Sequence, residues 1–587
     1  MRMPMIQTLS TVLLTSCAAT SQSLQAAAPV PTLLPAEIER YRTDRAALRS
    51  FYDIDGSPVR LERLDAFDRG WLDRLDGIDF DALDVAGRVD WLLLRTEVEY
   101  GLDQRAMERA RRAGLATLLP FEEAVGALER ARWEVAPLDA REAAATLAQI
   151  AEQAEDVKER AQREARDGEG EGSDEDALVL GAVEARRVAE WVSDLRGTLG
   201  TWYRHYDAFD PGFAWWCEEP HDAAREALDA LAKHLREDVA GLKGEDDDPL
   251  VGDPIGRAAL ELDLAHEWLA SSPEELIAVG EAELAWCDAR LVEAAGDLGF
   301  GDDWRAALEH VKGLHVEPGA QDELVAAQAR EAIAFLKERD LVTIPPLCEE
   351  TWRVRMLDER SQRTLPFAAY GGQKMLVAFP TRGMDHDSKL MSLRGNNIHF
   401  TRCVTPHELI PGHHLQGFMA RRHATHRGLF RTPFLVEGWA LYWEMVEWDE
   451  GWAKTPEDRI GMLFWRKHRA ARIVVSLRFH LGEMAPQEMI EFLVERVGHE
   501  RDSATSEVRR YVGDGYSPLY QCGYMIGGLQ LRALARELVE SGKMTPREFH
   551  DGILHLGPIP IELIRASLLG LELGRDARAT WSPALGS

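Results

Sequence analysis

Three histidines and one glutamate fall within eight residues of this chain, in the string TPHELIPGHHLQ at 405–416. In a regular H-E-x-x-H helix, two histidines one turn apart hold a metal ion. The glutamate after the first histidine takes a proton from a metal-activated water. Here Pro411 stands where the second histidine would be, and the next histidines are His413 and His414. His407 and Glu408 therefore keep the first half of the motif, and the second half is displaced.

The displacement requires a bend in the backbone. A straight helix would separate the α-carbon of His407 from those of the later histidines by about 9 or 10.5 Å. That is too far for two imidazoles that must each come within about 2.0–2.1 Å of one ion. Pro411 lacks a backbone donor and Gly412 has the widest backbone freedom, so we expect the helix to break there. The sequence predicts a metal site with His407 and either His413 or His414. The alternative is that His407 caps a helix and that His413 and His414 are ordinary surface or core histidines.

A second string, FLVEGWALYWE at 434–444, carries two glutamates. Glu437 lies 24 residues after His413. A carboxylate from a following helix would complete a set of two histidines and one glutamate, which is the ligand set of a catalytic zinc site with an open fourth position. Glu444 lies two turns further along the same helix face, where it could accept a hydrogen bond from a ligating imidazole. The alternative is that Glu437 and Glu444 lie on a solvated helix face. Their sequence neighbours are apolar, however, which indicates a buried helix, and a buried carboxylate without a partner is costly.

Hydrolysis of an amide by an activated water also creates an oxyanion, which needs hydrogen-bond donors beyond the metal ion. Tyr524 and His480, in the C-terminal part of the chain, are the candidates. By spacing alone, a buried core position with one hydrogen bond is the more common outcome for either residue.

Helices must position these residues. From 35 to about 337 the sequence is rich in Ala, Leu, Glu and Arg with helical periodicity, which predicts that this region is nearly all helix. Between 342 and 400 short apolar segments alternate with Gly and Pro, so we expect a small sheet directly before the metal-binding helix. Long helices then resume. The predicted fold is mainly α, with a helical N-terminal region at 29–340 and a catalytic metal-binding region at 341–587.

The charge of the 587-residue chain excludes several classes of partner. With 68 Lys and Arg against 100 Asp and Glu, the formal net charge is −32. A nucleic-acid binder needs a basic stripe and an anionic membrane surface needs a basic patch, and neither is present. No stretch after the first thirty residues has 18 apolar residues without a charge, so no membrane-spanning segment is expected. Acidic segments at 167–176 and 243–249 are interpreted as solvated loops.

Residues 1–28 have the outline of a bacterial export signal, with a positive start, an apolar run at 5–14, and then small and polar residues. The string LTSC that ends at Cys17 resembles a lipoprotein box, whose cysteine would carry a lipid anchor. The alanines at 26–28 suit ordinary signal cleavage, in which case Cys17 is a chance thiol. Each interpretation places the mature protein outside the cytoplasm, in the periplasm or lipid-anchored to the cell envelope.

The chain resembles the bacterial family catalogued as domain of unknown function 885. The resemblance rests on HExxPGHHLQ at 407–416, VEGWAxYxE at 436–444 and YxxG at 524–527. That family is similar to helical zinc peptidases such as thimet oligopeptidase, angiotensin-converting enzyme and the thermostable carboxypeptidases. This similarity implies a large helical body with a deep central channel and Zn²⁺ at its floor.

The resemblance also implies roles for individual residues. The implied Zn²⁺ ligands are His407, His413 and Glu437. His414 would replace His413 if the Pro-Gly insertion packs differently. Glu408 would be the general base that later protonates the leaving amine. Tyr524, together with His480, would stabilise the oxyanion, and Arg510 is a candidate partner for a peptide carboxylate.

We therefore expect an exported zinc metallopeptidase that cleaves short peptides inside a channel too narrow for folded proteins. One rival is a cell-surface binding protein that keeps the metal without hydrolysis. Retention of Glu408 argues against this rival, since a structural site needs no base. The other rival is a zinc hydrolase of a non-peptide amide or ester. The sequence does not specify the oligomeric state.

Overall fold

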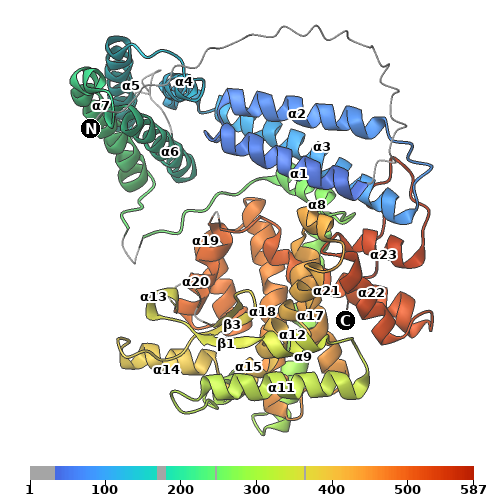
Figure 1. The fold of residues 1–587 in the computed structure, drawn as a ribbon. Helices are drawn as coiled ribbons and strands as arrows, with labels where there is room; N and C mark the ends of the chain where they lie inside the picture. The colour runs from blue at the N-terminus through green and yellow to red at the C-terminus, as the bar shows by residue number, and fades with distance from the viewer. Residues whose placement is uncertain are drawn as a thin grey trace, which may run out of the picture.

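The structure, a computed structural model, describes residues 34–167, 180–244, 248–362, 365, 367–513 and 515–586. Within these ranges the chain is mostly helical and forms one small sheet, so the predicted mainly α fold is confirmed (Figure 1). The expected export signal, including Cys17, lies outside the described residues, as does most of the predicted loop at 167–176.

The N-terminal helices form two groups, which lie at the upper right and upper left of Figure 1. The first group is α1 (Leu34–Phe51), α2 (Pro58–Asp76) and α3 (Val85–Ala113). The second group is α4 (Glu122–Trp133), α5 (Ala140–Asp167), α6 (Ala182–Asp207) and α7 (Pro211–Lys233). Buried side chains of α4–α7 form a core of their own. The buried side chains of α1–α3 instead belong to the main core, which they share with helices from α8 onward.

The remaining helices form the body below these two groups in Figure 1. They are α8 (Arg257–His266), α9 (Pro273–Asp297), α10 (Trp304–Lys312), α11 (Gln321–Arg339), α12 (Pro346–Thr351), α13 (Glu359–Gln362), α14 (His386–Gly395), α15 (Ile398–Glu408), α16 (His413–Ala420), α17 (Pro433–Asp449), α18 (Pro456–His480), α19 (Pro486–Phe492), α20 (Arg501–Val512), α21 (Tyr520–Ala535), α22 (Pro546–Leu556) and α23 (Ile561–Leu569). Short 3-10 and π segments are η1 (Ala116–Leu118), η2 (His234–Val239), η3 (Thr425–Phe430), η4 (Leu493–Val497) and η5 (Arg536–Glu540).

A three-stranded sheet precedes the candidate metal-binding motif, as the alternation of short apolar segments with Gly and Pro between 342 and 400 predicts. Its strands are β1 (Arg353–Met356), β2 (Ala368–Tyr370) and β3 (Lys374–Val377), in the order β1-β3-β2. β1 runs parallel to β3, with Arg353 opposite Lys374, and β2 runs antiparallel to β3, with Tyr370 opposite Met375. β2 also contacts α15, so the edge of the sheet reaches the helix that carries the first histidine of the motif.

Glycines allow α17 and α21 to pack closely, and this contact matters for the site. A Cβ added at Gly527 would lie 1.8 Å from the carbonyl oxygen of Phe434, and one added at Gly438 would lie 2.6 Å from the backbone of Gly527. No side chain fits at either position without moving a helix. The close approach sets Glu437 of α17 opposite Tyr520 at the start of α21.

Helix α18 crosses the middle of the body and packs against α9, α15 and α21 (Figure 1). It begins at an N-cap, Thr455, whose side chain accepts a hydrogen bond from the amide of Asp458, and Pro456 occupies the first helical position. Most of its side chains are buried, including a run of cationic residues. Arg466 pairs with Glu283, which illustrates how these buried charges are compensated.

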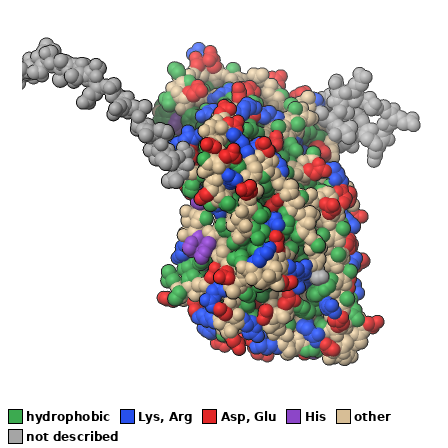
Figure 2. All heavy atoms as spheres, turned by 90° about the vertical axis from the view of Figure 1, so that its right-hand side faces the viewer, with side chains coloured by type: hydrophobic (Ala, Val, Ile, Leu, Met, Phe, Trp, Pro, Cys, Tyr) green, Lys and Arg blue, Asp and Glu red, His purple; other side chains and the backbone are tan. Residues whose placement is uncertain are grey.

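The exterior mixes charges of both signs. On the face drawn in Figure 2, Lys and Arg side chains lie interspersed with Asp and Glu, and no continuous basic stripe crosses it. Across the described ranges, none of the helices taken singly has the length and apolar character needed to cross a membrane. The pair α22 and α23, bent by 120°, passes the same test of length and composition together.

Candidate metal centre

The candidate metal-binding motif is divided between two helices. α15 ends at Glu408 and α16 begins at His413, and the chain between them leaves helical geometry at Leu409 (φ −106°, ψ −105°) and Gly412 (φ −76°, ψ −132°). The peptide bond before Pro411 is cis. A Cβ at Gly412 would lie only 1.8 Å from the carbonyl oxygen of His407, so this turn accepts no side chain there. The break occurs at the Pro-Gly step, where the sequence predicts it.

The break brings His407 and His413 together, with ring centroids 4.9 Å apart. Glu437 of α17 joins them, and one ligand atom from each of the three residues lies within 4.8 Å of the other two. Oε2 of Glu437 lies 3.1 Å from Nε2 of His413 and 3.9 Å from Nε2 of His407. All three side chains are largely enclosed. Two imidazoles and one carboxylate therefore converge on a single point.

His414 takes no part in this group. Its Nε2 lies 3.0 Å from the backbone carbonyl oxygen of Cys348, and its Nδ1 lies 3.4 Å from the hydroxyl of Tyr370. Burial lowers the pKa of His414, although the Cys348 carbonyl opposes this effect. Both ring nitrogens are thus directed away from His407. Of the two histidines that the sequence leaves open, the structure places His413 beside His407.

The charges at the centre fit a bound cation. Burial by itself would raise the pKa of Glu437, but His413, His407 and the hydroxyl of Tyr520 hold this pKa well below its usual range. Burial would lower the pKa of His413, but the nearby carboxylates of Glu437 and Glu408 raise it. Oε2 of Glu437 is buried without a hydrogen bond, although it faces two imidazole nitrogens. A metal ion is the partner that would satisfy all three groups at once.

A second layer of contacts orients these three side chains. Nδ1 of His407 lies 2.7 Å from Oε1 of Glu444, and the same carboxylate oxygen lies 2.9 Å from Arg469 of α18. The hydroxyl of Tyr520 donates a hydrogen bond to Oε1 of Glu437. Glu444 therefore occupies the position that the sequence analysis gives it, next to a candidate ligand.

The candidate metal centre opens into a cavity of about 250 Å³. Glu408, Tyr370 and Tyr524 line it together with the candidate ligands. Glu408 is mostly buried, and its carboxylate makes no hydrogen bond or ion pair with the described residues. A carboxylate that faces the cavity beside the ligands, without a partner, is free to exchange a proton with a molecule bound there.

Tyr524 lies beside the centre, with its ring parallel to that of His407 and the ring centroids 6.2 Å apart. The guanidinium of Arg472 lies 4.7 Å from the centroid of the same tyrosine ring. Burial and the charge of Glu437 raise the pKa of Tyr524. The hydroxyl therefore stays protonated at neutral pH and can donate a hydrogen bond into the cavity.

His480 lies elsewhere, at the end of α18. It does not line the cavity, and its backbone carbonyl accepts a hydrogen bond from the amide of Gly256. The physical reason is helix length, because His480 is eight residues beyond the cavity-lining Arg472, about 12 Å along the axis. Burial lowers the pKa of His480 to about 4, and neither ring nitrogen has a hydrogen-bond partner. The structure thus supports no role for His480 at the oxyanion.

Comparison with known proteins agrees with the sequence motifs. Residues 54–568 match the model of a family described as bacterial protein of unknown function, DUF885. The chain belongs to the DUF885 family. No curated protein matches it.

Among the solved structures that share the fold of this DUF885 protein, two are each described as a "putative lipoprotein". The protein from Shewanella oneidensis, of unknown function, is 17% identical, with a TM-score of 0.65 over 92% of this chain and 100% of the other. The protein from Colwellia psychrerythraea is also 17% identical, with a TM-score of 0.57 over 91% of this chain and 97% of the other. At this identity the similarity establishes the fold.

Sequence reasoning missed several residues of the DUF885 site. Tyr520 lies one helical turn before Tyr524, and this spacing on one helix face could have identified it. Arg469 and Glu507 come from separate helices, and no local signal in the sequence links either of them to the motif. Tyr370 comes from β2, and only the folding of the sheet against α15 brings it near the histidines.

Proposed function

We propose that this DUF885 protein is an exported zinc-dependent metallopeptidase that hydrolyses short peptides. The observation that carries the proposal is the convergence of His407, His413 and Glu437 at the wall of a cavity that Glu408 also lines. Two histidines and one glutamate are the ligand set of catalytic zinc sites with an open position. A structural zinc site would instead use four protein ligands, and the described residues offer three.

The ligand set fits Zn²⁺, which when bound would polarise a carbonyl group and lower the pKa of a nearby water. Glu408 is the general base in this proposal. Its unpaired carboxylate takes a proton from the attacking water and returns it to the leaving amine. Tyr524 donates its hydroxyl proton in a hydrogen bond to the oxyanion that develops on the scissile carbonyl. Glu444 and Arg469 hold His407 in place throughout.

Peptides are the preferred substrate class because of the resemblance to helical zinc peptidases. In those enzymes a glutamate on the second helix is the third ligand and another follows seven residues later, as Glu437 and Glu444 do here. An exported location, periplasmic or lipid-anchored through Cys17, is supported by residues 1–28 and by the description of both structural neighbours. The two other candidate functions, a metal-containing binding protein and a hydrolase of non-peptide amides or esters, become outcomes of the test.

The test combines metal analysis with a peptide-library digest of the wild type and of Glu408→Gln. We expect about one zinc per chain in both proteins and cleavage by the wild type alone. Zinc in both proteins with cleavage by neither would favour the binding protein. Hydrolysis restricted to non-peptide amides or esters would favour the third function. Equal peptide cleavage by both proteins would refute Glu408 as the base.

A further inference from the structure

The cavity beside the metal centre is rich in cationic side chains, although the chain as a whole carries a net charge of −32. The arginines that line it are Arg431, Arg469, Arg472 and Arg510. The carboxylates that line it are Glu408, Glu437 and Glu507. The two sets do not pair one to one, because Glu437 is itself a candidate metal ligand beside His407 and His413, and Glu408 has no cationic partner. The arginines are therefore paired unevenly with carboxylates.

Two of the arginines share a single carboxylate. Nη2 of Arg472 lies 2.8 Å from Oε2 of Glu507, and Nη1 of Arg510 lies 3.0 Å from Oε1 of the same residue. The hydroxyl of Tyr511 donates a further hydrogen bond, of 2.6 Å, to Oε2 of Glu507. His468 also lies near this carboxylate, at 3.6 Å, but burial lowers its pKa so that the ring is neutral. Two guanidinium charges therefore meet one carboxylate, and one positive charge is left without a counter-ion.

Arg469 has its own partner, Glu444, and so it does not contribute to the surplus. Arg510 is the more accessible of the pair on Glu507, with 23% of its side chain exposed against 7% for Arg472. Its second hydrogen bond goes to the neutral hydroxyl of Tyr516, at 3.1 Å. A guanidinium has five N–H donors, so Arg510 keeps donors for a ligand in the cavity.

Arg431 adds a second cation to the wall of the cavity. It is exposed, makes no ion pair with any described residue, and lines the cavity together with His413. Arg431 and the pair Arg472–Arg510 thus line the same cavity as the candidate metal ligands. A partly enclosed surplus of positive charge is costly unless an anion neutralises it.

We propose that the substrate carries a carboxylate and that the pair Arg472–Arg510 binds it within the metal cavity. This inference rests on the proposed function, because it names the substrate class of the same site. The carboxylate is either the C-terminal group of a peptide or an acidic side chain, since a planar guanidinium recognises both in the same bidentate way. Arg510 is the specificity residue in this proposal, and Glu507 is a positioning residue that holds both guanidiniums toward the cavity.

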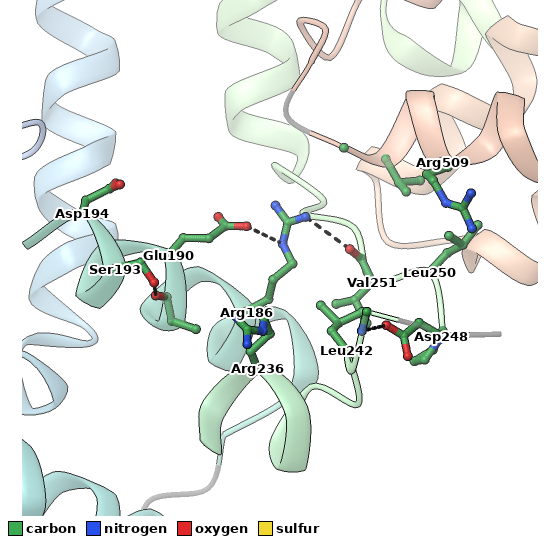
Figure 3. A pocket seen from close by; sticks show the side chains of 15 residues that line it. Arg186, Glu190, Ser193, Asp194, Arg236, Leu242, Asp248, Leu250, Val251 and Arg509 are labelled. Carbon is green, nitrogen blue, oxygen red and sulfur yellow. Dashed lines mark hydrogen bonds and ion pairs between the residues drawn. The ribbon is translucent and has the colours of Figure 1, made fainter. Parts of the chain in front are cut away.

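The neighbouring residue on α20 supplies a matched control. Arg509 is exposed and lines a different hollow, of about 590 Å³, between α6 and the end of α20. Figure 3 shows Arg509 on that helix, across the hollow from Arg186 and Asp194. Arg509→Gln removes the same charge from the same helix without touching the metal cavity. Both variants remove one guanidinium from α20, Arg510→Gln from the metal cavity and Arg509→Gln from the other hollow.

The experiment measures binding to the metal-free protein, so that its outcome does not depend on hydrolysis. The probes are N-acetyl tetra-alanine as the free acid, the same peptide as the carboxamide, and a carboxamide in which the third alanine is replaced by glutamate. Calorimetric titration gives the Kd of each. We expect at least one carboxylate-bearing probe to bind about 10-fold or more tightly than the uncharged carboxamide. Arg510→Gln should abolish this ratio, Arg510→Lys should leave it intermediate, and Arg509→Gln should preserve it.

The pattern of results identifies the source of the carboxylate and can overturn the inference. A preference for the free acid assigns the site to a peptide C-terminus, and a preference for the glutamate peptide assigns it to an acidic side chain. Equal binding of all three probes would overturn the inference, as would a ratio that survives Arg510→Gln in a folded protein. If the ratio depends on Arg510 but the zinc-loaded protein cleaves nothing, only the proposed peptidase activity fails. Arg510→Lys keeps a charge beside Glu507 and guards against loss of folding in Arg510→Gln.

Discussion

Nδ1 of His407 lies 2.7 Å from Oε1 of Glu444, so the carboxylate determines which imidazole nitrogen is available to a metal ion. Burial would raise the pKa of Glu444, but Arg469 and His407 hold it below its ordinary value. The carboxylate is therefore ionised and accepts the proton of Nδ1. The other nitrogen of His407, Nε2, is left with a free lone pair directed toward Glu437.

Glu444→Gln should weaken zinc binding by about 10- to 100-fold, because an amide no longer fixes the tautomer of His407 or balances Arg469. Competition with a chromophoric chelator measures the affinity. Glu447→Gln is the matched control, one turn along the same helix. Burial raises the pKa of Glu447 well above its usual range, so this side chain is neutral and nearly isosteric with glutamine. Equal affinities in Glu444→Gln and the wild type would contradict the orienting role.

The two adjacent histidines after the break should behave differently. His413→Ala removes a candidate ligand, and we expect this variant to retain less than about a tenth of the zinc that the wild type holds after dialysis. His414→Ala removes only contacts to Cys348 and Tyr370, so zinc content should remain near that of the wild type. The measurement is the zinc content of each variant, and circular dichroism checks that both variants are folded. The reverse pattern would mean that His414 is the ligand.

The turn between α15 and α16 should tolerate no side chain at Gly412. Its Cβ would meet the carbonyl oxygen of His407 at 1.8 Å, and relieving that clash must move a candidate ligand. We expect Gly412→Ala to lower the free energy of unfolding by about 1–3 kcal/mol and to weaken zinc binding. Gly70→Ala, inside α2 with open space around the new methyl, should be neutral or slightly stabilising. A Gly412→Ala variant with wild-type stability and zinc affinity would count against this turn geometry.

Much of the fold follows from local pattern. Helical periodicity predicts the mainly α body. The short apolar segments that alternate with Gly and Pro after residue 342 predict the small sheet before the motif. The break at Pro411 and Gly412 could be predicted because a straight helix cannot bring two histidines six residues apart to one ion. These features depend on residues close together in the sequence, which is why the sequence alone could indicate them.

The rest depends on contacts between distant elements. Whether His413 or His414 faces His407 is decided by the backbone angles of Leu409 and Gly412, which no residue type specifies. The distance of His480 from the cavity follows from where α18 ends. Arg469 reaches Glu444 only because α18 packs beside α15 and α21, so its place at the site is a property of the assembled core.

Tyr524→Phe tests the oxyanion donor by removing a single oxygen atom. The ring keeps its contacts with His407 and Arg472, so folding and zinc content should not change. Loss of the hydroxyl should lower kcat for peptide hydrolysis by about 10²- to 10³-fold with a small effect on KM. Tyr520→Phe is an informative comparison, since the hydroxyl of Tyr520 contacts the candidate ligand Glu437 and its loss should affect zinc affinity instead. A kcat unchanged in Tyr524→Phe would remove this residue from the mechanism.

His480 should influence stability at acidic pH and not catalysis. Burial lowers its pKa to about 4 in the folded protein, against an ordinary value of about 6.5 in the unfolded chain. As the pH falls below 6.5 the unfolded chain binds a proton that the folded protein does not, so stability decreases until the pH falls through 4. The loss from this one residue is at most about 3 kcal/mol.

His480→Leu should remove that loss, because leucine does not titrate and leaves no buried ring nitrogen without a partner. Chemical denaturation at pH 7, 6, 5 and 4 should therefore show the variant gaining stability relative to the wild type as the pH falls. His499 and His550, whose pKa values burial also lowers to about 4, keep both proteins acid-sensitive, so the difference between the two is the quantity to measure. Peptidase activity at pH 7 should match that of the wild type. A folded, zinc-loaded His480→Leu protein without activity would return His480 to the catalytic site.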